Sequence, residues 1–451
     1  MSSHYTLTDS SKIAVIGGGP AGSLFALFAL KMAKRVDKKI GITIFEPKDF
    51  SRSGPSGCNK CGGVISEHLV QKLALEGINF PPKIVQRGID SYVLHTEKGR
   101  VVIQSPAAEK RIATVYRGGG PVGTQEKDRG GFDDFLLQSA LAEGATLVRT
   151  RIVGIAPGEK YVLSAKDAED YEADLVVGAF GVNNPTWKLF EGLDHGYKRP
   201  ATTSAFVTEL ALGKEVVSKN FGTSIHFFLL PEPKNIQFAA LIPKGNFVTL
   251  CILGSKVDRQ TVQALLNRPE TKELLPADVM DRKNCKCFPK LSLRCAKNAF
   301  TDRLIIIGDA GSTRLFKDGI GAAYGMAKAA AKTAVLHGIS KRHFAEYYLP
   351  VYRRTAVDNM YGRCLYAITD IFKKNRQMSE CLLRVVQKEQ EQEADSRVLS
   401  SILWDTFTGN EPYKTILLRG VNIKMNVDLV MELSRTIRRG ADENWRTRQN
   451  I

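Results

Sequence analysis

A glycine-rich turn between two apolar segments near the N-terminus constrains the fold of this chain more than any other feature. Lys12–Ile16 is a short apolar strand, and the motif Gly-x-Gly-x-x-Gly follows it directly at residues 17–22. A helix is expected from Ser23 to about Lys34, and a second strand rich in β-branched residues at Gly41–Glu46. This order of strand, turn, helix and strand predicts a βαβ unit.

Each glycine of the motif has a separate physical role. Gly17 permits the tight turn, Gly19 lets the backbone approach a pyrophosphate, and Gly22 lets the helix pack closely on the strand. The helix N-terminus then offers free N–H groups to the diphosphate. A carboxylate at Glu46, at the end of the second strand, suits the ribose hydroxyls of an adenosine. The predicted cofactor-binding residues of this unit are Gly17, Gly19, Pro20, Ala21, Gly22 and Glu46.

A second glycine-rich motif lies almost 300 residues downstream, after the apolar strand Arg303–Ile307. Gly308-Asp309 follows that strand, and Asp318-Gly319-Ile320-Gly321 opens an Ala-rich helix over Ala322–Leu336. Paired with the first motif, this pattern predicts the second half of an FAD site. Asp309 is expected to bond a ribityl hydroxyl, and the N–H groups of residues 319–321 to face the pyrimidine end of the flavin.

Composition and charge narrow the class of protein. A chain of 451 residues with 43% hydrophobic residues suits two or three soluble domains. The polar start Met1–Ser11 and the lack of a run of eighteen apolar residues predict a cytoplasmic protein without a transmembrane helix. The net charge of +17 is consistent with the solubility of a basic protein, and it also favours attraction to anionic ligands, such as a dinucleotide, or to an anionic membrane surface. Nucleic-acid binding is not expected, because no Lys/Arg block reaches five or six residues.

The rest of the chain predicts further layers. Ser91–Gln104 predicts a hairpin, and strand-like runs between about 200 and 255 predict an antiparallel sheet. Residues 341–451 are predicted to be mostly helical. We expect this region to form a lid or buttress, with contact to a membrane as the alternative. We expect an α/β fold: a Rossmann-like FAD-binding domain, an inserted antiparallel substrate domain and a helical C-terminal region. The expected boundaries are 1–89, 116–190 and 299–340 for the FAD-binding domain, 90–115 and 191–298 for the substrate domain, and 341–451 for the helical region.

These motifs together resemble the FAD-dependent hydroxylase-like flavoproteins of the p-hydroxybenzoate hydroxylase fold, and within them the geranylgeranyl reductase group. The resemblance covers about residues 12–340, and its most specific element is Cys61-Gly62-Gly63 in the loop after the second strand. It implies that this loop lies along the flavin. Arg129, before Phe132-Asp133, matches an arginine that contacts FAD in the family.

Two departures from the family affect the expected chemistry. Phe180-Gly181, followed by Trp187-Lys188, stands where the family has Asp-Gly and an arginine associated with flavin and nicotinamide contacts. Direct reduction by a nicotinamide cofactor is therefore not expected, and a protein electron donor becomes an alternative. The family's aromatic-rich cavity strand corresponds to Phe238–Pro243, which has lost most of the large aromatics. The cavity is expected to be wider or differently shaped.

Cysteines and histidines supply further candidates. Cys58-x-x-Cys61 and Cys285-x-Cys287 have the residue types of a zinc or iron–sulfur site. The spacing favours no metal, with Cys61 as the flavin-proximal candidate and a redox-active Cys58/Cys61 pair as an alternative. His226 and Tyr324 are more consistent with core packing than with proton donation. No residue of the sequence is identifiable as the proton donor.

The sequence therefore predicts an FAD-dependent oxidoreductase. The resemblance implies reduction of carbon–carbon double bonds in a hydrophobic isoprenoid or lipid substrate, at the surface of a membrane or free in the cytoplasm. Two alternatives use the same fold: an FAD-dependent monooxygenase, and an electron-relay flavoprotein without small-molecule turnover.

Overall fold

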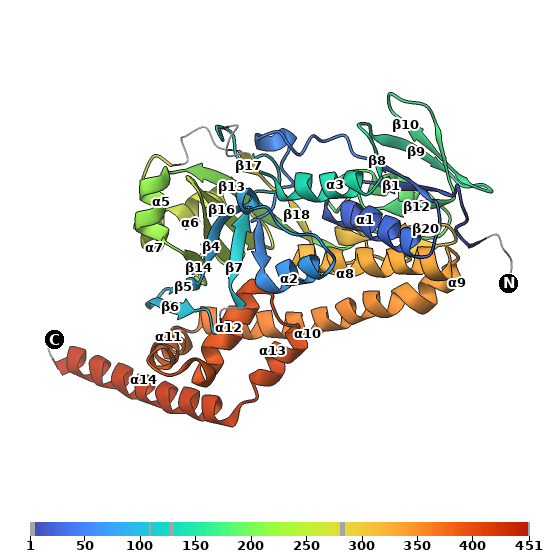
Figure 1. Cartoon of the computed structure of the whole chain (residues 1–451). Coiled ribbons are helices and arrows are strands. Elements are labelled where there is room, and N and C mark those ends of the chain that lie inside the picture. The colour runs from blue at the N-terminus through green and yellow to red at the C-terminus, as the bar shows by residue number, and fades with distance from the viewer. Residues whose placement is uncertain (1–4, 108–109, 126–129, 280–284, 450–451) are drawn as a thin grey trace.

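The computed structural model describes residues 5–107, 110–125, 130–279 and 285–449 of the protein (Figure 1). Its N-terminal part is built on a six-stranded sheet with helices on one side and a small three-stranded sheet on the other. In spatial order the strands are β19 (Phe300–Thr301), β20 (Leu304–Ile306), β12 (Leu175–Gly178), β1 (Lys12–Ile16), β2 (Gly41–Phe45) and β8 (Thr146–Val148). All neighbours pair in parallel except β19 with β20.

The central strands of this sheet are mostly apolar because both faces are covered, one by helices and the other by the three-stranded sheet. Helix α1 (Pro20–Arg35) packs against α3 (Phe132–Ala142) and α8 (Gly319–Lys332). The predicted βαβ unit, the strand after residue 303 and the Ala-rich helix are therefore confirmed, with bounds within a few residues of those expected. A three-stranded sheet, β9 (Ile152–Ala156), β10 (Tyr161–Ala165) and β11 (Tyr171–Ala173), was not predicted.

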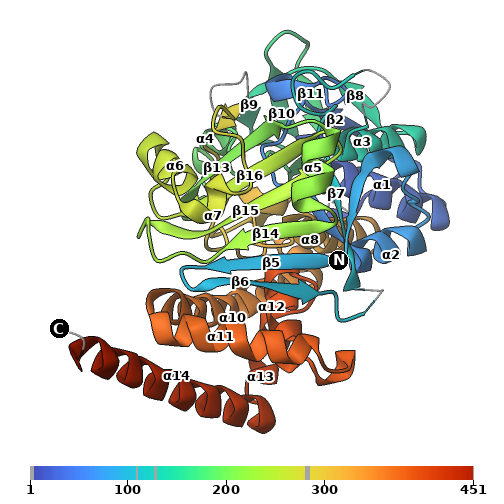
Figure 2. The same ribbon diagram turned by 90° about the vertical axis from the view of Figure 1, so that its left-hand side faces the viewer.

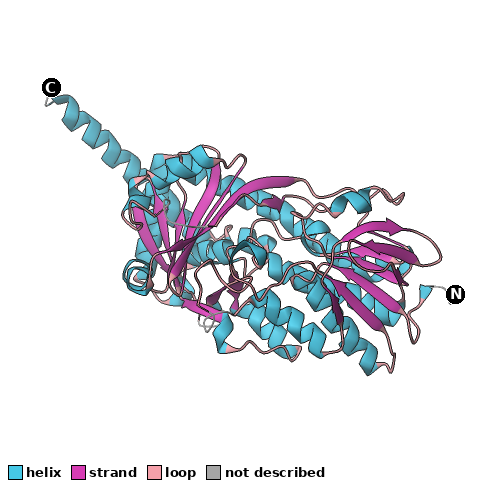
Figure 3. Ribbon diagram, turned by 90° about the horizontal axis from the view of Figure 1, so that it is seen from above, coloured by secondary structure: helices cyan, strands magenta, loops and turns pink. Residues whose placement is uncertain are grey.

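The second layer is an eight-stranded sheet at the opposite end of the molecule (Figure 3). Its order is β17 (Lys286–Cys287), β13 (Thr202–Ala211), β16 (Phe247–Gly254), β15 (Ile236–Lys244), β14 (Ser224–Phe228), β5 (Ser91–Thr96) and β6 (Gly99–Gln104), with β18 (Lys290–Ser292) also on β13. The predicted hairpin 91–104 is confirmed. The strands between 200 and 255 pair antiparallel, as predicted, whereas β14 also pairs in parallel with β5, with Ser224 beside Ser91.

A small sheet connects the two layers. It consists of β3 (Val64–Ser66), β7 (Ile112–Val115) and β4 (Val85–Ile89), and it is followed in the first layer by α2 (Glu67–Leu75). Helices α5 (Lys214–Phe221), α6 (Arg259–Leu266) and α7 (Pro269–Lys272) cover one face of the large sheet, and α4 (Trp187–Glu191) lies beside β9. Strand alternation gives this sheet two apolar faces, and the second one is covered by the C-terminal region.

The C-terminal region is helical, as predicted. It comprises α9 (Lys341–His343), α10 (Leu349–Lys374), α11 (Arg376–Gln390), α12 (Val398–Thr408), α13 (Tyr413–Arg419) and α14 (Ile423–Gln449). Figure 2 shows α10, α11 and α12 beneath β5 and β6, and α14 packs on α11 with its C-terminal end extending beyond the body. In the described part of the chain, no helix combines the length and apolar character that a membrane span requires.

Candidate active site

A cavity of about 1130 Å³ joins the two layers. One end is lined by the glycine turns of the six-stranded sheet, and the other by the second apolar face of the large sheet. Twelve predicted cofactor-binding residues line it: Gly17, Gly19, Pro20, Ala21, Glu46, Cys61, Gly62, Gly63, Gly308, Asp309, Gly319 and Ile320. The fold therefore brings together segments that are up to 300 residues apart in sequence.

The glycines of the first turn fit the roles assigned to them. Gly17 has φ +110°, and a Cβ there would meet the Ala179 carbonyl oxygen at 2.5 Å. A Cβ on Gly22 would meet the Gly17 carbonyl oxygen at 1.9 Å, so Gly22 lies behind the cavity and sets the helix–strand spacing. The space beside Gly19 is open, with only Asn59 Nδ2 at 3.8 Å from its ideal Cβ. No side chain caps the N-terminus of α1, which leaves its first N–H groups facing a cavity suited to an anion.

Glu46 stands at the end of β2 and is buried. Its carboxylate accepts hydrogen bonds from the Gly18 and Lys48 N–H groups, both at 2.9 Å. Burial nevertheless raises the pKa of Glu46 above its ordinary value. The Glu46 carboxylate thus holds the glycine turn in place. Glu46 also borders the cavity, where its carboxylate could accept a hydrogen bond from a ribose hydroxyl.

The Cys61-Gly62-Gly63 loop crosses the middle of the cavity wall. Gly63 has φ +65°, and a Cβ there would lie 2.1 Å from the Val115 carbonyl oxygen. A Cβ on Gly62 would press on Cys251 Sγ and Ile242, both at 3.1 Å. The two glycines let the loop lie flat between β7 and the large sheet, so only glycine fits at residue 63.

An ion pair that the sequence did not reveal supports this loop. Arg117 Nε and Nη2 donate to Asp133 at 2.6 and 2.9 Å, and Asp133 is fully buried at the start of α3. Burial works against the charge on Arg117, but Asp133 and the adjacent Cys61 sulfur raise the pKa of Arg117 above its ordinary value. Arg117 lines the cavity, whereas the predicted Arg129 lies outside the described residues. The triple glycine after Arg117 is the only sequence signal that could have marked it.

The second glycine-rich motif, residues 308–321, lines the same end of the cavity as the first glycine turn. Asp309 borders the cavity after β20, and burial raises its pKa. Asp318, in the left-handed region at φ +52°, caps α8 by accepting from the Gly321 N–H at 3.1 Å. Gly321 therefore lies behind the cavity wall, and the N–H groups of Gly319 and Ile320 are the ones nearest a ligand.

The apolar end of the cavity is more aromatic than the sequence indicated. Phe238 on β15 is joined by Tyr92 on β5, Phe227 on β14, Phe316 before α8 and Phe407 on α12. The Phe227 ring stacks on Phe407 at 4.0 Å and on Phe238 at 4.9 Å between centroids. The aromatics missing from the predicted cavity strand are thus supplied by other elements. The C-terminal region closes the cavity through Phe407 and Thr408.

His226 and Tyr324 do not reach the cavity. Because side chains alternate along β14, Phe227 faces the cavity and His226 faces the opposite side. There His226 Nδ1 lies 2.9 Å from His95 Nε2, and burial lowers the pKa of both imidazoles. The Tyr324 hydroxyl donates to Glu76 at 3.2 Å on the outer side of α8. Both side chains are structural, as the sequence favoured.

The cysteine pairs do not converge. Cys61 lines the cavity, whereas Cys58 accepts from the Lys60 N–H at 3.2 Å in its own turn, and burial raises the pKa of the Cys58 thiol. Cys287 lies on β17 at the far edge of the large sheet. Within the described ranges, no group of three or more His, Cys, Asp or Glu side chains could hold a metal ion.

We therefore expect Cys58→Ser to leave the metal content of the protein unchanged. A neutral thiol in a local turn has neither the thiolate charge nor the partners that zinc or iron needs. Elemental analysis of the wild type and the variant measures this directly. One zinc or several irons per chain, lost in Cys58→Ser, would show a metal site that includes residues outside the described ranges.

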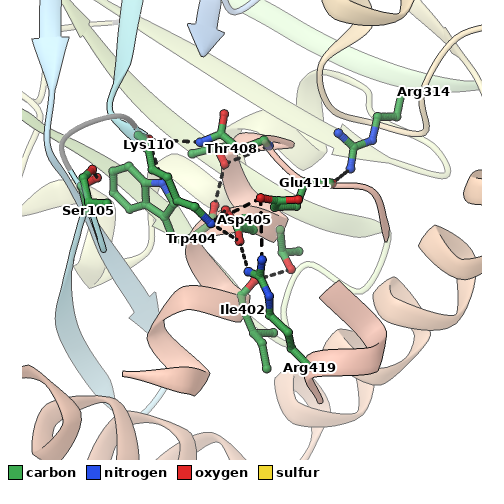
Figure 4. Close-up of polar contacts among 12 residues, drawn as sticks. Ser105, Lys110, Arg314, Ile402, Trp404, Asp405, Thr408, Glu411 and Arg419 are labelled. Carbon is green, nitrogen blue, oxygen red and sulfur yellow. Dashed lines mark hydrogen bonds and ion pairs between the residues drawn. The ribbon is translucent and has the colours of Figure 1, made fainter. Parts of the chain in front are cut away.

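Polar contacts hold the C-terminal helices against the cavity (Figure 4). Lys110 Nζ and the Arg419 guanidinium both pair with the fully buried carboxylate of Asp405. Trp404 Nε1 donates to the Lys110 carbonyl at 3.0 Å, and Arg314 donates to the carbonyls of Gly409 and Glu411. Since the Arg314 contacts join the segment before α8 to the loop after α12, the cavity cannot open there without breaking them.

Comparison with known proteins finds similarity to flavoproteins. No family model matches it. An uncharacterised protein of Methanosarcina barkeri is 25% identical over 228 residues, which are 49% of this chain and 51% of that protein. The FAD-dependent monooxygenase ltmM of Epichloe festucae is 26% identical over 213 residues, 43% of this chain and 44% of that protein. The chain thus spans about half the length of the curated relatives it matches.

Solved structures match nearly the whole chain. A mutant of the flavin-dependent brominase Bmp2 has a TM-score of 0.60 at 14% identity, covering 90% of this chain and 98% of its own. A mutant of halogenase PltM in complex with FAD has a TM-score of 0.59 at 13% identity, covering 91% and 86%. A flavoprotein/dehydrogenase from Cytophaga hutchinsonii has a TM-score of 0.58 at 15% identity, covering 92% and 99%. The predicted fold, an FAD-binding domain with a second sheet and a helical C-terminal region, is confirmed.

Proposed function

We propose that this protein is an FAD-dependent oxidoreductase that oxygenates an apolar small molecule. The observation that carries the proposal is the continuity of the cavity from the glycine cradle to the aromatic chamber. A dinucleotide in the cradle would leave the chamber free for a second molecule beside it. Among the similar proteins, a FAD-dependent monooxygenase and flavin-dependent halogenases favour oxygenation over the reduction of a double bond.

The chain's own residues fit the parts of FAD in order. The N-terminus of α1 and the open space at Gly19 would hold the pyrophosphate, Glu46 the adenosine ribose, and Asp309 the ribityl chain. The loop Cys61–Gly63 and the N-terminus of α8 would border the ring. When bound, FAD supplies two-electron redox chemistry and, when reduced, reaction with oxygen. The protein binds and orients both molecules and excludes water with the apolar chamber.

Reduction of a carbon–carbon double bond by a geranylgeranyl reductase-like enzyme is the second candidate. It is favoured by one observation, the Cys61-Gly62-Gly63 loop on the cavity wall. An electron relay, the third candidate, needs no chamber of this kind.

Reoxidation in air separates the candidates. The purified, flavin-loaded protein is reduced with dithionite under argon and mixed with air-saturated buffer. An oxygenase should recover its flavin absorbance within seconds, because fast reaction with oxygen is its function. A reduced form that persists for minutes in air would favour double-bond reduction and contradict the proposal.

We also expect slow direct reduction by NADH and NADPH. Phe180 borders the cavity and packs on Phe190 at 4.7 Å between centroids, so no carboxylate stands at this wall to meet a nicotinamide or an adjacent arginine. Stopped-flow bleaching of the flavin by each nucleotide, with dithionite as the positive control, measures the rate. Rapid, saturable bleaching by either nucleotide without substrate would show that the departure at Phe180 does not matter. If bleaching is slow, a protein electron donor becomes the expected source of electrons.

Contact with an anionic membrane surface remains part of the proposal. It is supported by the net charge of +17 and by exposed apolar side chains at the junction of α13 and α14, namely Leu418, Val421 and Ile423. Such contact should weaken with salt. Co-sedimentation with anionic liposomes at low and high salt tests it, and absence of binding at low salt would rule it out.

A further inference from the structure

A single ammonium group borders the aromatic chamber within the described residues. Lys317 lies in the segment before α8, and its side chain lines the cavity beside Phe227 and Phe238. Its Nζ is 4.8 Å from the Phe227 ring centroid and 4.4 Å from that of Phe238. The other walls of the chamber are mostly aromatic or aliphatic, with the hydroxyls of Tyr92 and Thr408 and the thiol of Cys251. Arg314 and Asp318 also line the cavity near Lys317, but they pair with each other at 3.9 Å.

The segment that carries Lys317 is held rigidly by the C-terminal helices. Asn359 on α10 accepts from the Leu315 N–H and donates to the Thr313 carbonyl, both at 2.8 Å. Tyr413 on α13 donates to the Leu315 carbonyl, and the Arg314 guanidinium stacks on the Tyr413 ring at 4.3 Å. Figure 4 shows Arg314 directed at the loop that contains Glu411. The backbone of residues 313–315 is therefore fixed just before Lys317, and α8 begins two residues after it, which limits how far this side chain can move.

Lys317 lacks the partners that a buried charge needs. Across the described parts of the chain, its ammonium makes no ion pair or side-chain hydrogen bond, although aromatic faces attract it. Burial lowers the pKa of Lys317 to about 8 and outweighs the opposing effect of Cys251. Burial also raises the pKa of that thiol to about 12, so Cys251 is neutral and supplies no counter-charge. An ammonium in such surroundings is expected to pair with something that enters the cavity.

We propose that Lys317 recognises an acidic oxygen group on an otherwise apolar substrate, a carboxylate or a phenolic or enolic hydroxyl. This inference rests on the proposed function, since it names the substrate class of the same cavity. The aromatic rings would bury the apolar body, and the ammonium would donate a charge-assisted hydrogen bond to the oxygen. A plain hydrocarbon substrate would leave that donor unsatisfied.

Matched probes test the proposal on the flavin-loaded protein. Binding of 2-naphthoate and of the neutral 2-naphthalenemethanol is measured by titration calorimetry in the wild type, Lys317→Met and Lys317→Arg. The wild type should prefer naphthoate by about 10-fold or more, the usual value of a hydrogen bond to a charged group. Lys317→Met should lose that preference while still binding the alcohol, and Lys317→Arg should retain most of it.

A second experiment distinguishes a carboxylate substrate from a phenolic or enolic one. 2-Naphthol changes its absorption on ionisation, so a bound naphtholate at neutral pH in the wild type, absent in Lys317→Met, would assign a phenolic or enolic substrate. Preference for naphthoate without this change would assign a carboxylate.

A matched control removes a charge elsewhere. Lys219 is exposed on α5, on the far side of the large sheet, so Lys219→Met should keep the wild-type preference. Equal binding of naphthoate and alcohol by the wild type, a preference that survives in Lys317→Met, or no naphthoate binding at millimolar concentration would each overturn the proposal. The flavin content of every variant is measured separately from its absorbance. Loss of flavin from the wild type would instead contradict the proposed function, while the probe preference would still be measurable.

Discussion

Gly19→Val should fold normally and purify without colour. The backbone at Gly19 has φ −67° and ψ −176°, an extended conformation that valine adopts readily, and the space beside it is open cavity. The new side chain would therefore project to where the pyrophosphate binds, without clashing with the protein. Losing two charge-assisted hydrogen bonds costs about 3–6 kcal/mol, roughly 100-fold or more in affinity for FAD.

Flavin absorbance per chain, before and after dialysis against excess FAD, measures the effect. Gly88→Val is the matched control, because a Cβ at Gly88 on β4 meets nothing within 4 Å and lies away from the cavity. It should remain yellow. A Gly19→Val protein with a full complement of FAD would show that the cradle has been assigned to the wrong turn.

The second large effect is expected at the Arg117–Asp133 pair. Arg117→Met leaves the fully buried Asp133 carboxylate with Asn59 as its remaining side-chain partner. Removing one partner of a buried ion pair lowers the free energy of unfolding by about 3–5 kcal/mol. The double variant with Asp133→Asn carries no unpaired charge and should recover most of that loss.

Urea denaturation of the three proteins at two FAD concentrations separates the two consequences of Arg117→Met. Weaker flavin binding changes the dependence of stability on FAD concentration, whereas the lost ion pair lowers stability at both concentrations. If the Arg117→Met/Asp133→Asn protein is no more stable than Arg117→Met, the loss in free energy of unfolding comes from the lost packing of Arg117 rather than from the unpaired charge of Asp133.

The contiguous motifs were predictable because their physics is local. Strand Lys12–Ile16 and the turn that ends at Gly22 lie within about ten residues, and the left-handed φ of Gly17 and the helix–strand contact of Gly22 depend on that spacing alone. The same holds for Gly308-Asp309 before α8. These segments predicted the nucleotide-binding fold and eight of the twelve cavity-lining residues without knowledge of the rest of the chain.

Only the tertiary structure decided which side chains meet across the cavity. Arg117 pairs with Asp133, which lies 16 residues further along the chain. Phe227 lines the cavity and His226 does not, because one face of β14 points toward the C-terminal helices and the other points away from them. A strand presents alternate side chains to opposite faces, so an apolar run on both faces, as here, contains no signal of which face is the cavity. The sequence does not distinguish Lys317, because a lysine beside a helix start is ordinary. Its significance comes from rings on β14 and β15, which lie 79 or more residues away in the chain and become its neighbours only when the two layers close.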